Sequence, residues 1–199
     1  EEKVMDLDDH AIPESVEVLS LPVTVTEIGE EAFASCPGLK YLLVAEETSL
    51  PDSMPEGCRI FYSGTAYGEL WLASLAMDPE GVLYGVLNDF STAILLSVPE
   101  GLASYEIPEL QGASAGLRPE DVADVTLCAV TSMDPKALEE ADSLTSLTLN
   151  GNMSFPAEMY DRLASLEAFS YPEDSFTYDY ILTLQAARQI NEARSAADM

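Results

Sequence analysis

Basic residues are scarce in this sequence. Eight lysines and arginines stand against 36 aspartates and glutamates in 199 residues, which gives a formal net charge of −28 at pH 7. Nucleic-acid binding needs clustered Lys and Arg side chains that displace counterions from phosphates, and the few basic residues are scattered. The composition therefore argues against nucleic acid and anionic membranes as partners. An acidic surface mostly serves solubility, with cations or basic partners as the alternative.

Residues for common catalytic and metal sites are also few, with one histidine and three cysteines. The segment Gly112–Gly116 spells G-x-S-x-G, but a nucleophile elbow needs a later histidine and His10 precedes it. The Asp6, Asp8 and Asp9 cluster lacks the loop that closes a calcium site. No phosphate-binding glycine loop occurs. We expect a protein that is not an enzyme, with no catalytic, cofactor-binding or metal-binding residue. Paired carboxylates neither support nor oppose glycosidase chemistry.

Long apolar runs are missing as well. A membrane-spanning helix needs about 18 or more consecutive apolar residues, and no stretch approaches that length, so no membrane insertion is expected. The chain opens on EEKVMDLDDH, without an initiator Met or an apolar stretch. We expect that a leader was removed or left out. Cys36 is most simply a small buried apolar residue.

Leucines recur in a fixed order in the second half of the chain. Leu144, Leu147, Leu149 and Asn152 follow the leucine-rich repeat pattern L-x-x-L-x-L-x-x-N, in which a short strand is followed by a turn or short helix that returns the chain. Asp134 and Pro135 would cap and begin one such helix. Residues 25–44 match residues 130–149 at an offset of 105, and further copies lie 22 or 23 residues apart. The predicted strands lie at residues 39–44, 122–127, 144–149 and 166–171, with the last three as neighbours.

Two segments interrupt or end the repeats. Between residues 64 and 99, apolar side chains from Tyr67 to Leu75 fall at helical spacing, and residues 82–98 read as a β-hairpin around Asn88 and Asp89. Residues 174–199 have helical periodicity. The sequence thus predicts an α/β leucine-rich repeat solenoid of one continuous domain. Its parts are an N-terminal cap and repeats (1–63), a helix and hairpin insert (64–99), C-terminal repeats (100–173) and a C-terminal helix (174–199).

The N-terminal copy carries a more specific pattern. Residues Ile28-Gly29-Glu30-Glu31-Ala32-Phe33-Ala34-Ser35-Cys36, followed by Leu39 and Leu42, resemble the BspA-like, or Treponema-type, leucine-rich repeats of bacterial surface proteins. Later copies keep the spacing and lose these letters. The resemblance implies a noncatalytic, secreted or cell-surface module for protein–protein interaction or adhesion, placed outside the cell. It does not name the partner.

In such a repeat, the residues between the leucines project from the strand face and form the candidate partner-binding surface. These are Tyr41, Leu43, Asp124, Thr126, Ser146 and Thr148. Two alternatives remain open. The chain is a structural spacer that holds another domain away from a surface, or it binds carbohydrate through the aromatic side chains of the insert, Tyr67, Trp71 and Tyr84, by stacking on a sugar ring.

Overall fold

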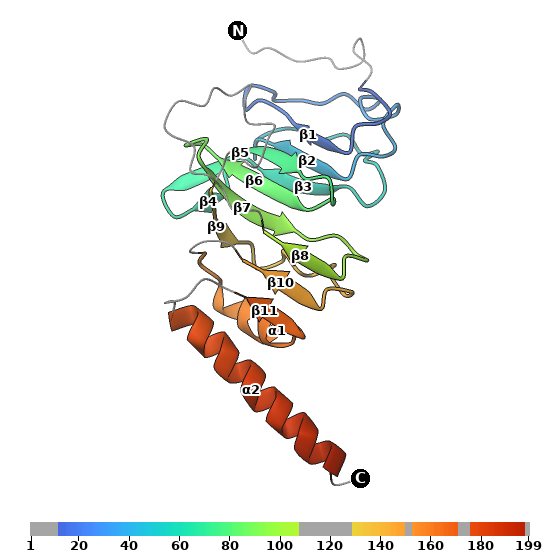
Figure 1. The fold of residues 1–199 in the computed structure, drawn as a ribbon. Coiled ribbons are helices and arrows are strands. Elements are labelled where there is room, and N and C mark those ends of the chain that lie inside the picture. Colours follow the sequence, from blue (N-terminus) through green and yellow to red (C-terminus); the bar gives the residue numbers. More distant parts are fainter. Residues whose placement is uncertain (1–11, 108–128, 150–152, 171–175, 198–199) are drawn as a thin grey trace.

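The computed structural model describes residues 12–107, 129–149, 153–170 and 176–197, which form three sheets and two α-helices (Figure 1). The N-terminal sheet holds β1 (Val18–Ser20), β2 (Tyr41–Val44) and β3 (Arg59–Tyr62), all parallel. The central sheet has the order β4 (Ala66–Tyr67), β5 (Leu70–Met77), β6 (Leu83–Leu87), β7 (Thr92–Ser97) and β9 (Ala129–Met133). The C-terminal sheet is parallel, with β10 (Ser146–Thr148) between β8 (Ser104–Glu106) and β11 (Ala168–Ser170). The helices are the 3₁₀ helix η4 (Ala157–Met159), α1 (Tyr160–Ala164) and α2 (Phe176–Ala197).

The predicted α/β leucine-rich repeat solenoid is wrong. Most of the regular secondary structure is β-sheet, and its largest part is the central sheet, which curls into a half-barrel between the two small parallel sheets. The repeat spacing appears only as local pairing: Leu19 is in register with Leu42, and Leu147 with Phe169. A spacing of 22 or 23 residues therefore predicts which short strands lie side by side. It does not predict what packs on their faces.

The helix predicted from Tyr67 to Leu75 is also wrong. These residues form the β4–β5 hairpin, and β5 continues antiparallel to β6. A short run of mostly apolar residues is compatible with a buried helix and with a strand that is covered on both faces. Here the run forms a strand because it pairs with β6. The predicted hairpin forms: β6 and β7 are antiparallel, with Gly85 opposite Ile94.

The central sheet is buried on both faces. From β7, Ile94 and Leu96 point into a cluster with Tyr41 and Leu43 of the N-terminal sheet. The alternate residues Ala93 and Leu95 belong to the cluster on the opposite side. Successive side chains on a strand point to opposite faces, so the continuous apolar run of β7 reflects a strand with protein on both sides.

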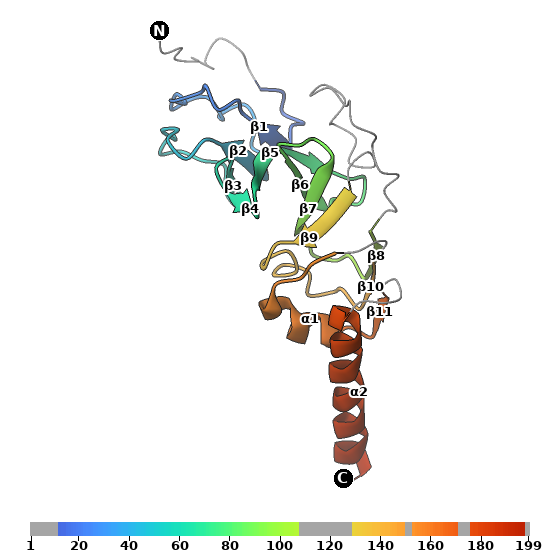
Figure 2. The same ribbon diagram turned by 90° about the vertical axis from the view of Figure 1, so that its left-hand side faces the viewer.

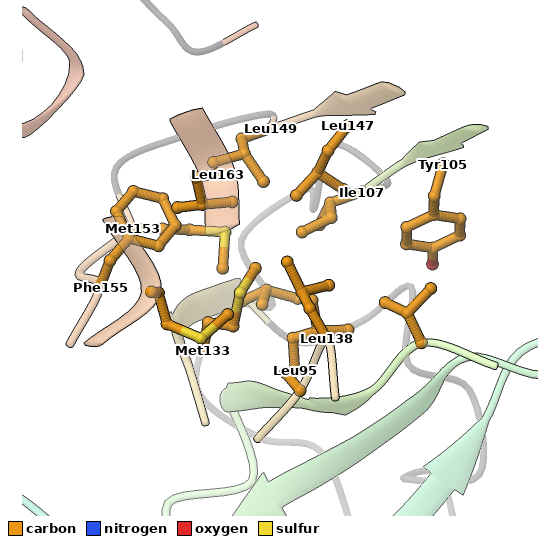
Figure 3. Close-up of a cluster of buried hydrophobic side chains, with 14 of the residues drawn as sticks. Leu95, Tyr105, Ile107, Met133, Leu138, Leu147, Leu149, Met153, Phe155 and Leu163 are labelled. Carbon is orange, nitrogen blue, oxygen red and sulfur yellow. The ribbon is translucent and has the colours of Figure 1, made fainter. Parts of the chain in front are cut away.

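The larger cluster fills the space between the central and C-terminal sheets (Figure 3). Leu95 and Met133 enter it from the central sheet, Leu147 from β10 and Leu163 from α1. The helix expected after Asp134 is absent; residues 135–140 form turns with hydrogen bonds such as Ala137 N–H to Asp134 O. Leu138 is nevertheless buried, as the helical pattern required of it.

The predicted strand at residues 122–127 lies outside the described residues. Strand β10 pairs with β11 on one edge, as predicted for residues 144–149 and 166–171. On its other edge it pairs with β8 and not with residues 122–127, so this part of the prediction is wrong. The C-terminal helix forms where the sequence predicts it. Helix α2 packs its first turns on α1 and then extends away from the body (Figures 1 and 2). Among the described helices, none combines the length and apolar character that a bilayer crossing requires.

Candidate functional site

The predicted partner-binding row is not a continuous surface. Tyr41 and Leu43 are buried, with exposed fractions of 6% and 0%, because the central sheet covers that face of β2. This face of β2 therefore leaves little side-chain surface for a partner, although Tyr41 lines part of a hollow of about 660 Å³. Ser146 and Thr148 are partly exposed on β10. Asp124 and Thr126 lie outside the described residues.

The three aromatic side chains of the insert do not form one platform. Tyr84 is fully buried, and its hydroxyl shares a hydrogen bond with that of Tyr105. In the β4–β5 hairpin Tyr67 is opposite Leu70 and Trp71 is opposite Ala66, so the Tyr67 and Trp71 side chains point to opposite faces. Trp71 is 51% exposed.

A different hollow is lined largely by residues of the central sheet and its connections. It has a volume of about 500 Å³ and is bounded by the β4–β5 hairpin, the start of β7, the end of β9 and the segment 154–156. None of its lining residues is charged, and we call it the neutral groove. The lining residues are Tyr67, Gly68, Leu70, Leu87, Thr92, Thr131, Ser132, Met133, Pro135, Ser154 and Pro156.

Hydrogen bonds hold the walls of the neutral groove together. The Tyr67 hydroxyl donates to Oδ2 of Asp134 at 3.1 Å and so ties the β4–β5 hairpin to the end of β9. The other oxygen, Oδ1, accepts the Lys136 N–H at 2.9 Å. On the second wall, the Ser154 N–H donates to the Thr131 carbonyl at 2.8 Å. The groove is therefore fixed on both sides by bonds within the chain.

The Tyr67 phenol keeps its proton. Burial raises its pKa, and the neighbouring Asp134 carboxylate raises the pKa further because it disfavours a second negative charge. At neutral pH the phenol is thus a hydrogen-bond donor, and Asp134 is its acceptor.

The remaining lining offers apolar surface and free hydroxyl groups. Leu70, Leu87 and Met133 contribute apolar side chains. The hydroxyls of Thr131 and Ser132 make no hydrogen bond to the described part of the chain. Ligand pockets of several hundred Å³ commonly combine apolar walls with a few such polar groups. The arrangement suits an uncharged ligand with apolar and hydrogen-bonding parts.

No local sequence pattern predicts this groove, because its residues come from four separate segments, 67–70, 87–92, 131–135 and 154–156. The central sheet brings the first three segments together, and the pairing of Ser154 with β9 adds the fourth. Among the lining residues, the sequence predicts a binding role only for Tyr67, as part of an aromatic cluster that does not form.

A second hollow, of about 660 Å³, has the opposite character. Glu80, Glu100 and Glu140 line it together with Lys40, and the Lys40 ammonium pairs with Glu17 at 3.0 Å. Within the described ranges, no three acidic, histidine or cysteine side chains are grouped closely enough to hold a metal ion.

No family model, curated protein or solved structure matches the chain. The resemblance to BspA-like repeats therefore rests on the residues quoted above.

Proposed function

We propose that the protein is a noncatalytic recognition module that binds a partner protein through the neutral groove. The observation that carries the proposal is the contrast in charge. The chain has a net charge of −28, yet no charged residue lines the groove. A segment without charge avoids the desolvation cost of burying an ion there.

The partner segment is an extended, uncharged stretch with one or two apolar side chains. Its backbone N–H and C=O groups would meet the hydroxyls of Thr131 and Ser132, and its apolar side chains would pack on Leu70 and Met133. In many peptide-binding proteins, polar groups form hydrogen bonds with the peptide backbone and pockets bind its side chains. The location outside the cell and the adhesion role, both implied by the resemblance, belong to the same proposal.

Selection from a random peptide library displayed on phage tests the proposal. We expect selected peptides to be poor in charged residues and rich in apolar ones. Thr131→Arg places a long cation at the wall of the groove and should weaken binding of the selected peptides at least about tenfold. Ser104→Arg is the matched control, because Ser104 is exposed on β8 and does not line the groove. Peptides that bind both variants equally well, or a selection without binders, would overturn the proposal.

Carbohydrate binding is the second candidate, because the Tyr67 ring lines the groove and Trp71 is exposed. A glycan array separates the two sites. Binding lost in Thr131→Arg would place the sugar in the groove, whereas binding lost only in Trp71→Ala would place it on the opposite face of the hairpin. A chain that binds neither peptides nor glycans fits the spacer alternative.

A further inference from the structure

Helix α2 is supported over only part of its length. Its 22 residues span about 33 Å at 1.5 Å per residue. Ile181 is buried, the Tyr180 ring meets the Tyr160 ring at 5.5 Å, and the Gln185 side chain donates to the carbonyls of Leu163 and Leu166. Beyond this contact the helix runs away from the body (Figures 1 and 2). Isolated helices shorter than about 12–15 residues are marginal in water, so the outer half needs support from elsewhere.

A second face of α2 is apolar and exposed. Leu182, Ala186, Ile190 and Ala193 follow one another at steps of four, four and three residues, which places them on one side of the helix. Leu182 is 37% exposed and Ile190 is 53% exposed. This face, which we call the outer face, lies away from the side of the helix that carries Ile181 and Gln185.

The charge of α2 differs from that of the rest of the chain. Its sequence holds two acidic residues, Asp179 and Glu192, and two basic ones, Arg188 and Arg194, so its formal charge is −2 + 2 = 0. The whole net charge of −28 therefore lies on the other parts of the chain. Two copies that approach through α2 meet without the repulsion that opposes contact between their acidic bodies.

We propose that the outer face of α2 binds the same face of a second copy of this chain, in antiparallel orientation. The face is self-complementary, as a twofold-symmetric contact requires. Leu182 and Ile190 lie four residues to either side of Ala186. A twofold axis at Ala186 places Leu182 of one copy opposite Ile190 of the other. The small alanine at the crossing lets the helix axes approach closely.

Charge selects the antiparallel arrangement over the parallel one. The body is attached at the N-terminal end of α2. A parallel pair would set two strongly acidic bodies side by side, whereas an antiparallel pair places them at opposite ends of the helices. Residual repulsion is screened by salt, so the dimer should tighten as ionic strength rises.

Sedimentation equilibrium of the full chain tests the proposal. We expect a monomer–dimer equilibrium whose dissociation constant falls with added NaCl. Ile190→Asp should raise that constant by at least about tenfold. Val23→Asp is the matched control, because Val23 is 67% exposed on the body and its loss should leave the dimer intact. Circular dichroism of both variants checks that the sheets remain folded. A monomer at every concentration and salt level overturns the proposal, as does an equal effect of the two substitutions.

The orientation is tested with a spin label on Ala196→Cys, in a chain whose three native cysteines are replaced by alanine. In the antiparallel pair the two labelled positions are 20 residues apart along the helices, or roughly 30 Å. In a parallel pair they would be about 10 Å apart. The short distance would overturn the antiparallel assignment. Because Ile190 and Ala196 lie outside the neutral groove, failure here leaves the proposed function untouched, and the reverse also holds.

Discussion

The Tyr105 hydroxyl donates a 2.5 Å hydrogen bond to Oδ2 of Asp78 and shares a second hydrogen bond with the hydroxyl of Tyr84. Tyr84 lies on β6 of the central sheet and Tyr105 on β8 of the C-terminal sheet. The other oxygen of Asp78 accepts the N–H groups of Glu80 and Val82 at 2.9 Å. This chain of bonds ties the two sheets together at one end of their shared core.

The first prediction concerns alkaline unfolding. Burial raises the pKa of both Tyr84 and Tyr105 far above the ordinary value of 10.0, and the Asp78 carboxylate adds to the increase. The stability due to these raised pKa values is fully present below pH 10 and is lost as the pH rises toward the folded-state values, because only the unfolded chain releases the protons. Each such group should lower the free energy of unfolding by about 1.4 kcal/mol per pH unit above pH 10. Tyr84 and Tyr105 together contribute about 2.7 kcal/mol per pH unit, and Tyr67, whose pKa is raised as well, adds to the slope. Urea unfolding between pH 8 and pH 12 measures it.

Tyr105→Phe is the control for this prediction. It removes one of these groups, so the slope above pH 10 should become smaller by about 1.4 kcal/mol per pH unit. A spectroscopic titration of the folded wild type in which both buried tyrosines ionise near pH 10 would contradict the assignment.

The second prediction concerns the two faces of β2. Leu42 points into the N-terminal cluster and Leu43 into the cluster shared with the central sheet, and both are fully buried. Leu42→Ala and Leu43→Ala should each cost about 2–5 kcal/mol of unfolding free energy, as buried leucines do. Chemical denaturation measures both. A loss at Leu43 below about 1 kcal/mol would mean that this face is open.

The matched pair lies on β10, where only one face is covered. Leu147 is fully buried and Ser146 is partly exposed. Leu147→Ala should again cost about 2–5 kcal/mol, whereas Ser146→Ala and Thr148→Ala should each cost under about 1 kcal/mol. Comparable losses at Leu147 and Ser146 would count against the C-terminal core as described.

The comparison of β2 with β10 shows where sequence reasoning succeeded and where it failed. The repeat spacing correctly gave the buried leucines, including Leu42 and Leu147, and the parallel register of Leu19 with Leu42. Those features depend only on the spacing of apolar residues within and between repeats, which can be read from the sequence. The burial of Tyr41 and Leu43 depends on the central sheet, whose strands begin more than twenty residues later. No periodicity in residues 39–44 carries that information.

The prediction of the fold class was wrong for a related reason. Residues 70–77 are apolar at positions that satisfy both helical and strand patterns, and pairing with β6 settled the matter. The β6–β7 hairpin succeeded because the two runs flank a turn with favourable side chains, Asn88 and Asp89. The neutral groove could not be predicted, since Tyr67 and Thr131 belong to the two edge strands of a five-stranded sheet and line one hollow only because that sheet curls.

The third prediction concerns the turn of that hairpin. Asp89 accepts four hydrogen bonds, from the backbone N–H and the hydroxyl of both Ser91 and Thr92. Partial burial opposes ionisation, but these bonds outweigh it and lower the pKa of the carboxyl below 3.8. The resulting stability is present above pH 3.8 and is lost as the pH falls through the lower folded-state value.

Asp89→Ala should therefore cost about 0.5–2 kcal/mol at neutral pH, as the loss of a capping side chain does. The measurement is the urea midpoint at pH 7 and again at pH 3, where the difference between the variant and the wild type should be smaller. Asp52→Ala serves as the control, because Asp52 is exposed and its carboxylate makes no hydrogen bond to the described residues. If Asp52→Ala costs as much, the effect comes from removing negative charge and not from the turn.

The fourth prediction concerns the absence of a side chain at Gly85, in the middle of β6. A Cβ there would lie 2.9 Å from Cδ1 of Leu96 and closer still to Cδ1 of Leu72, because those side chains fill the space between Leu83 and Leu87 on that face. Gly85→Ala should overpack this cluster and cost about 1–3 kcal/mol. Chemical denaturation measures it, with Gly38→Ala as the control, since a Cβ at Gly38 meets its nearest atom at an ordinary 3.5 Å.

A double variant separates overpacking from a change in backbone preference. Leu72→Ala alone creates a cavity and should cost about 2–5 kcal/mol. In Gly85→Ala with Leu72→Ala, the new methyl group occupies part of that cavity, so the combined loss should be smaller than the sum of the two single losses by at least about 0.5 kcal/mol. Strictly additive losses would mean that the Gly85 methyl group does not meet Leu72, and that the tight approach of β5 and β6 is not what requires glycine at this position.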